Sequence, residues 1–70
     1  MKPLVVASLQ DGGGDRCIDI LRLAEGYAWV EGRRDPEDPH GWRHLHPPIS
    51  GYASDAEARA AAADATWLAE

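Results

Sequence analysis

The sequence predicts an α+β fold in which a three- to four-stranded antiparallel β-sheet, a meander, packs against one C-terminal α-helix. Two observations carry this prediction. The middle of the chain alternates between apolar and polar residues and is interrupted by turn residues, as the strands of a hairpin are. The last third is rich in alanine at helical spacing and begins with a helix cap. We expect residues 1–70 to form a single small domain.

Length and composition limit the classes of function. A chain of 70 residues buries only ~60% of the surface that its unfolded form exposes, so a metal or oligomerisation would add useful stability. Cys17 is the only cysteine, which excludes a disulfide within the chain. A net charge of −5 weighs against general binding to nucleic-acid phosphates. The single thiol and the lack of an export signal or long apolar run favour a cytoplasmic protein of bacterial type with no membrane partner.

The first element that we expect is a strand over residues 4–9. Its β-branched run lies between Pro3 and the glycines of residues 12–14, and it reads as a buried strand or a docked extended arm. The glycines lack the spacing of a phosphate-binding loop and have aspartates on both sides, which indicates a flexible turn. The candidate core residues are Leu4, Val5, Val6, Ile18, Ile20, Leu21, Leu23, Val30, Leu45, Ile49 and Leu68, with some of Trp29, Trp42 and Trp67.

A hairpin follows, with strands over residues 16–24 and 27–34 and a tight turn at Glu25–Gly26. A third hairpin strand is expected over residues 42–46, after an exposed loop over residues 35–41. If the strands pair as a meander, one face of the sheet holds Tyr27, Trp29, Trp42, His44 and His46. We expect the N-terminal strand, the chain ends or a second subunit to cover these aromatics. We expect the other face to be covered by the helix and to hold Ile18, Ile20, Ala28, Val30 and Leu45.

The helix is expected over residues 55–69, and residues 49–53 lead into it. Ser54 and Glu57 form a capping box, in which the hydroxyl takes the unpaired amide at the third helical position and the carboxylate reaches back to the cap. The broader of two apolar stripes is expected to lie against the sheet and holds Ala58, Ala61, Ala62, Ala65, Leu68 and Ala69. The second stripe is a candidate contact surface and holds Ala56, Ala60, Ala63 and Trp67.

Three histidines, His40, His44 and His46, raise the possibility of a metal site. His44 and His46 are two residues apart on the expected strand and would point the same way. Zinc would need further ligands, such as Asp38, Glu31 or Cys17, and no CxxC or HExxH motif supports this. We therefore interpret the histidines as solvated side chains and expect no metal and no cofactor.

Catalysis has little support in the sequence. Cys17 with His44 or His46 could form a nucleophile and its base. A lone cysteine on a strand is more often a small buried apolar residue, and no nucleophile elbow or oxyanion-type glycine turn accompanies it. We therefore expect a protein that is not an enzyme.

The resulting hypothesis is a non-enzymatic interaction module that binds a protein partner or itself. It would use the aromatic sheet face or the stripe that ends in Trp67. The candidate binding residues are Tyr27, Trp29, Arg33, Trp42, Arg43, His44, His46 and Trp67. The alternative is a nucleic-acid-binding module that presents aromatic and arginine side chains on the sheet, and a histidine metal site is a more distant alternative.

A resemblance accompanies this hypothesis. The hairpin strand YAWVEGRR and the capped helix SDAEARAAA occur in an order that is similar to small modules of three strands and one helix. Such modules include the N-terminal DNA-binding arm domains of tyrosine recombinases and short uncharacterised bacterial domains. The resemblance covers roughly three quarters of the chain. It implies a basic sheet face that contacts DNA, with Arg33, Arg34 and Arg43 in the corresponding strands.

Overall fold

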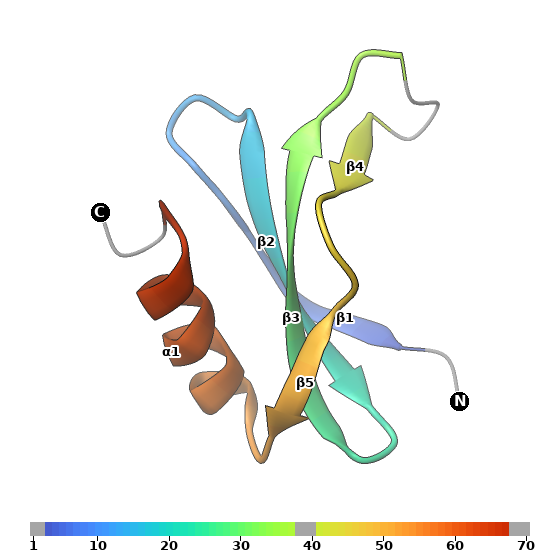
Figure 1. Ribbon diagram of the computed structural model, residues 1–70, viewed down its shortest axis with the longest axis vertical. Helices are drawn as coiled ribbons and strands as arrows, with labels where there is room; N and C mark the ends of the chain where they lie inside the picture. Colours follow the sequence, from blue (N-terminus) through green and yellow to red (C-terminus); the bar gives the residue numbers. More distant parts are fainter. Residues whose placement is uncertain (1–2, 38–40, 68–70) are drawn as a thin grey trace.

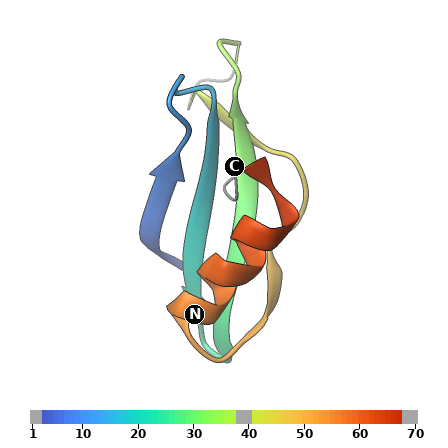
Figure 2. The same cartoon turned by 90° about the vertical axis from the view of Figure 1, so that its left-hand side faces the viewer.

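The computed structural model describes residues 3–37 and 41–67 and has the predicted α+β architecture. One antiparallel sheet is covered on one face by a single helix (Figure 1; Figure 2). The elements in chain order are β1 (Leu4–Gln10), β2 (Arg16–Leu23), β3 (Gly26–Arg34), β4 (Trp42–His44), β5 (Ile49–Tyr52) and α1 (Asp55–Ala65). The prediction of an antiparallel meander packed on a C-terminal helix is confirmed.

The sheet contains one strand that we did not expect. The meander runs in the order β1-β2-β3-β4, and β5 pairs with β3 beside β4. β3 has nine residues, and β4 occupies only its last part, Gly32–Arg34. β5 pairs with Tyr27–Trp29 at the other end of β3. The expected strand over 42–46 ends at His44, because the chain bends there and Pro47–Pro48 cannot supply ladder amides.

The register of the β2–β3 hairpin determines which side chains meet the helix. Leu23 pairs with Gly26, and the same register places Ile20 opposite Trp29. Directly opposite residues of an antiparallel pair lie on the same face. The core between the sheet and α1 consists of Ile18, Ile20 and Trp29 from the strands and Ala58 and Ala62 from the helix. The expectation that Trp29 lies on the face away from Ile18 and Ile20 is therefore wrong.

The opposite face has a smaller apolar cluster. Leu21, Ala28 and Val30 are buried there, and Leu23 packs against them. Ala28 and Val30 were expected on the face that the helix covers, but their partners in β2 are Leu21 and Asp19 rather than the isoleucines. The error has the same origin as that for Trp29, because one register fixes both faces.

Several expected core residues are exposed. The exposed fractions are 58% for Leu4, 52% for Val5 and 42% for Val6, so the start of β1 is not a buried strand. β1 is the edge strand of the sheet, and α1 packs against β2, β3 and β5. Leu45 and Ile49, on the opposite edge, are also exposed. Leu68 lies outside the described residues.

The N-cap at Ser54 is confirmed, but the carboxylate of Glu57 reaches back to Ala53, one residue before the cap. The amide of Glu57 donates to Ser54 Oγ at 3.1 Å, and the amide of Ala53 donates to Glu57 Oε2 at 2.8 Å. α1 ends at Ala65 instead of continuing to residue 69. Thr66 has an extended backbone, and its Oγ1 donates to the carbonyl of Ala62 at 2.7 Å, which satisfies a helix-end acceptor.

Asp11 holds the glycine-rich turn between β1 and β2. Its Oδ1 accepts from the amides of Asp15 at 2.9 Å and Arg16 at 3.3 Å, and its Oδ2 accepts from Arg16 Nε at 3.1 Å. Partial desolvation raises the pKa of Asp11, but these hydrogen bonds and the charge of Arg16 lower it by more. The net pKa of Asp11 therefore lies below its ordinary value of 3.8.

The Ser54→Ala variant tests the cap. It leaves the amide of Glu57 without its acceptor, and we expect the free energy of unfolding to fall by about 1 kcal/mol. Urea denaturation followed by circular dichroism measures the change. The exposed Ser50→Ala in β5 is the control and should change stability by less than about 0.5 kcal/mol. Equal effects of the two variants would contradict a role for the cap.

The Asp11→Asn variant tests the turn through its pH dependence. Because the folded pKa of Asp11 is lowered, its carboxylate stabilises the fold above the unfolded pKa, and this contribution is lost as the pH falls through the folded value. We expect D11N to be less stable than the wild type at pH 7 and the difference to shrink below about pH 3.8. Urea midpoints from pH 7 to pH 2 measure this. Asp64→Asn, on the exposed side of α1, controls for net charge, and the same trend in both variants would contradict the prediction.

Candidate interaction surface

The predicted aromatic face does not exist as one surface. Tyr27 and Trp29 lie on the side that α1 covers, and Trp29 is only 4% exposed. The indole Nε1 of Trp29 donates to the hydroxyl of Tyr52 at 3.4 Å. Trp42 pairs with Arg34, and His44 pairs with Gly32, on the opposite face. The structure therefore separates the aromatic residues that the sequence analysis grouped.

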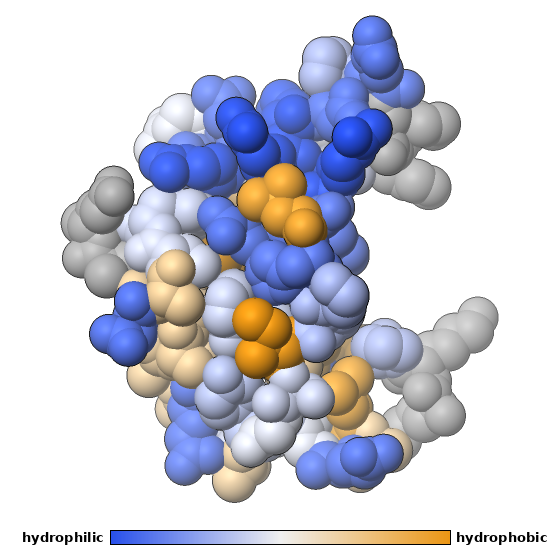
Figure 3. All heavy atoms as spheres, viewed as in Figure 1, coloured by the Kyte–Doolittle hydropathy of each residue, from blue (hydrophilic) through white to orange (hydrophobic). Residues whose placement is uncertain are grey.

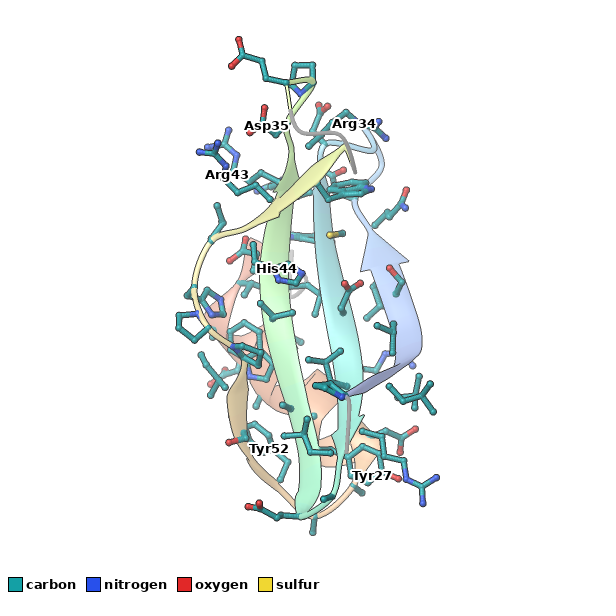
Figure 4. All side chains as sticks on the ribbon, turned by 90° about the vertical axis from the view of Figure 1, so that its right-hand side faces the viewer. Tyr27, Arg34, Asp35, Arg43, His44 and Tyr52 are labelled. Atoms are coloured by element: carbon teal, nitrogen blue, oxygen red, sulfur yellow. The ribbon has the colours of Figure 1, made fainter. Side chains whose placement is uncertain are left out.

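Trp42 and His44, the predicted binding residues on the face away from α1, each lie close to a charged side chain of the protein itself. Trp42 is half-buried, and the guanidinium of Arg34 lies 4.9 Å from the centre of its ring. His44 is exposed on the side away from the helix (Figure 4), and its Nε2 lies 3.8 Å from Asp19 Oδ2. That carboxylate accepts from Ser8 Oγ at 2.8 Å. The arrangement is a polar row across the sheet rather than a stacking platform.

His46 has a structural role that the sequence analysis missed. It follows the end of β4 and precedes β5, at the point where β3 has no strand partner on that side. The amide of Glu31 donates to His46 Nε2 at 3.4 Å, so the ring takes the place of a backbone acceptor. With Nε2 as acceptor, Nδ1 carries the proton and donates to the carbonyl of Pro47 at 2.7 Å. The ring edge also packs on Trp29, with centroids 5.3 Å apart.

The two described histidines therefore do not converge on one point. His44 faces Asp19, whereas His46 bonds the backbone of β3, so the expectation that they point the same way is wrong. Within residues 3–37 and 41–67, no group of three or more His, Cys, Asp or Glu side chains is arranged to hold a metal ion. His40 and Asp38 lie outside the described residues.

Cys17 is a buried free thiol on the face opposite the helix. A Cβ on Gly32 would meet its sulfur at 3.0 Å, so the missing side chain makes room for the thiol. Burial raises the pKa of Cys17, and the nearby carboxylate of Asp19 raises it further. The thiol is therefore protonated at neutral pH and poorly suited to nucleophilic attack.

A groove runs between β1 and α1. It has a volume of about 440 Å³, and its apolar lining comes from Ala7, Leu9, Ile20, Ala56, Ala60 and Ala63. The groove forms because the helix presents mainly small alanines on this side, and Asp55 and Arg59 of α1 complete its lining. Three of these alanines belong to the stripe that the sequence analysis proposed as a contact surface.

Trp67, the fourth member of that stripe, does not line the groove. It is half-buried and packs against the core beneath α1. The guanidinium of Arg16 lies 5.3 Å from the centre of its ring. Its indole Nε1 is buried and has no hydrogen-bond partner among the described residues. Trp67 therefore supports the end of the helix rather than forming an exposed anchor.

The outer edge of β1 borders the groove and is unusually open. Figure 2 shows β1 at the side of the sheet, with α1 lying across the neighbouring strands. Its sequence, LVVASLQ, has no charged residue, and its first three side chains are exposed. Natural edge strands are normally short, charged or covered. The opposite edge follows this rule, since it is divided between β4 with three residues and β5 with four.

Comparison of the chain with protein-family models, with curated proteins and with solved structures finds no match. The resemblance to recombinase arm domains therefore stays a prediction. No helix within the described part of the chain has the length and apolar character required to cross a bilayer.

The His46→Phe variant tests the role of His46 in the sheet. Phenylalanine keeps a ring edge against Trp29 but leaves the amide of Glu31 without its acceptor. We expect the free energy of unfolding to fall by about 1–3 kcal/mol, with faster hydrogen exchange at that amide. His44→Phe is the matched control, and it should change neither quantity as much. Unchanged exchange at Glu31 in the His46 variant would contradict the assignment.

Proposed function

We propose that the protein is a non-enzymatic protein-interaction module that binds a second copy of itself through the edge of β1. The observation that carries the proposal is the uncharged outer edge of this strand, on which Leu4, Val5 and Val6 are exposed. An open apolar edge offers both backbone hydrogen bonds and apolar area to another strand. Pairing removes both from water in one step.

A second copy suits this edge for two physical reasons. Identical strands can pair antiparallel about a two-fold axis, which gives a closed dimer with the same surface on both sides. The segment Leu4–Gln10 contains no charge, so it meets no like charge when it pairs with itself. If the axis is perpendicular to the sheet, both helices lie on one face. The two grooves then lie next to each other and bury their alanines.

The nucleic-acid alternative has weaker support. Trp29 is buried, so it is closed to stacking with a base. Trp42 is covered on one side by Arg34, and Arg43 is paired with Asp35 at 3.0 Å. The net charge of −5 also opposes approach to a phosphate backbone. Binding to DNA or RNA would therefore need a rearrangement of these contacts.

The Val5→Lys variant tests the proposed dimer. We expect sedimentation equilibrium to show that the wild type changes from monomer to dimer as its concentration rises. Lysine places a like charge on both strands of the pair, so V5K should dimerise at least about tenfold more weakly. Its circular dichroism spectrum should match that of the wild type, because Val5 is exposed.

The matched control is Ile49→Lys. Ile49 is 42% exposed and lies on β5, at the opposite edge of the sheet. The proposal requires I49K to dimerise like the wild type. A wild type that stays monomeric up to millimolar concentration would overturn self-pairing, and so would equal weakening by V5K and I49K.

A further inference from the structure

We propose that Arg33, with Arg16 and Arg43 on either side of it, forms a binding site for a phosphate-type oxyanion. The register of the sheet places these arginines next to one another: Arg16 pairs with Arg33, and Arg33 pairs with Arg43. Directly paired residues project from the same face, so three guanidinium groups follow one line across β2, β3 and β4. The line lies at the end of the sheet where hydrophilic residues gather in Figure 3.

The described residues neutralise this row of arginines only in part. The Nε of Arg16 lies 3.1 Å from Asp11 Oδ2, and Nη2 of Arg43 lies 3.0 Å from Asp35 Oδ2. The central residue, Arg33, is exposed, and its side chain makes no ion pair or hydrogen bond within the described part of the chain. Like charges directly opposite each other destabilise a sheet. An anion at Arg33 would relieve this repulsion on both sides.

The outer arginines are held in place, which favours a built site over a loose cluster. Asp11 anchors Arg16 from the turn, and the ring of Trp67 lies beneath the same guanidinium at 5.3 Å. Asp35 anchors Arg43 from the start of the β3–β4 loop. Because these side chains are ordered by their own partners, an arriving anion needs to immobilise mainly Arg33.

The number of donors favours phosphate over a carboxylate. Each guanidinium carries five N–H donors in a planar fork, and the row offers three such groups. A phosphate dianion has three terminal oxygens and two charges, whereas a carboxylate has two oxygens and one charge. Glu31 lies on the same face, two residues before Arg33, and Asp11 and Asp35 close the ends of the row. These carboxylates weaken the attraction for any anion, so the preference for phosphate rests on the guanidinium donors, which can bond all three of its oxygens.

The test is a titration of the protein with inorganic phosphate, followed through the arginine Nε–Hε NMR signals. Sodium chloride at equal ionic strength and sodium succinate are the parallel arms. We expect the signals of Arg33 and Arg43 to shift saturably with phosphate, less with succinate and not with chloride. Arg33→Gln should weaken phosphate binding about tenfold or more, which is the scale of a hydrogen bond to a charged group.

Arg22→Gln is the matched control. Arg22 is an exposed arginine on the same strand and face as Arg16, at the far end of β2. R22Q should bind phosphate like the wild type, and the amide spectrum of R33Q should keep its dispersion. Equal binding by R33Q and the wild type would overturn the site, as would equal shifts with phosphate and chloride or a stronger response to succinate. The site is independent of the β1 edge, so the Val5→Lys variant should keep it.

Discussion

The pairing of Ile20 with Trp29 is the contact on which the rest of the fold depends. It follows from the register of the β2–β3 hairpin and places the largest aromatic side chain of the core beside two isoleucines. That face must be covered, and α1 covers it with Ala58 and Ala62, both fully buried. Small helix residues allow a close approach to the sheet, but the alanines on the neighbouring side of α1 leave the space that becomes the groove. The candidate surface is therefore a by-product of how the core is packed.

The two edges of the sheet are handled differently. On one side, β3 is covered in two pieces by β4 and β5, and His46 supplies the acceptor in the gap between them. This edge is short, interrupted and rich in polar side chains. The other edge is formed by β1 alone, which is one uncharged strand. Its pairing with β2 has a register irregularity between Val5 and Ala7. A sheet that protects one edge and leaves the other open favours association through the open edge.

Charge and apolar surface are also separated. Arginines and their aspartate partners gather where β2 and β3 meet the β3–β4 loop, whereas the exposed valines and the groove lie along β1 and α1. The two proposals therefore use different parts of the molecule and can fail separately. Cys17 is a buried residue of the sheet, His44 lies beside Asp19, and His46 accepts a hydrogen bond from the backbone of β3. Neither a nucleophile with its base nor a metal-ligand set arises from them among the described residues.

Local patterns in the sequence determined the α+β class, the hairpin, the helix start at Ser54 and the alanine stripe beside the groove, because each depends on residues close along the chain. The sequence could also have predicted which face holds Trp29. Any two-residue turn here pairs even-numbered residues of β2 with odd-numbered residues of β3, so Trp29 must share a face with Ile20. The exposure of Leu4, the strand β5 and the acceptor role of His46 were decided by tertiary structure alone. They depend on which strands α1 packs against and on how β4 and β5 share the edge of β3. Contacts between segments far apart in the chain decide both, so no local sequence pattern predicts them.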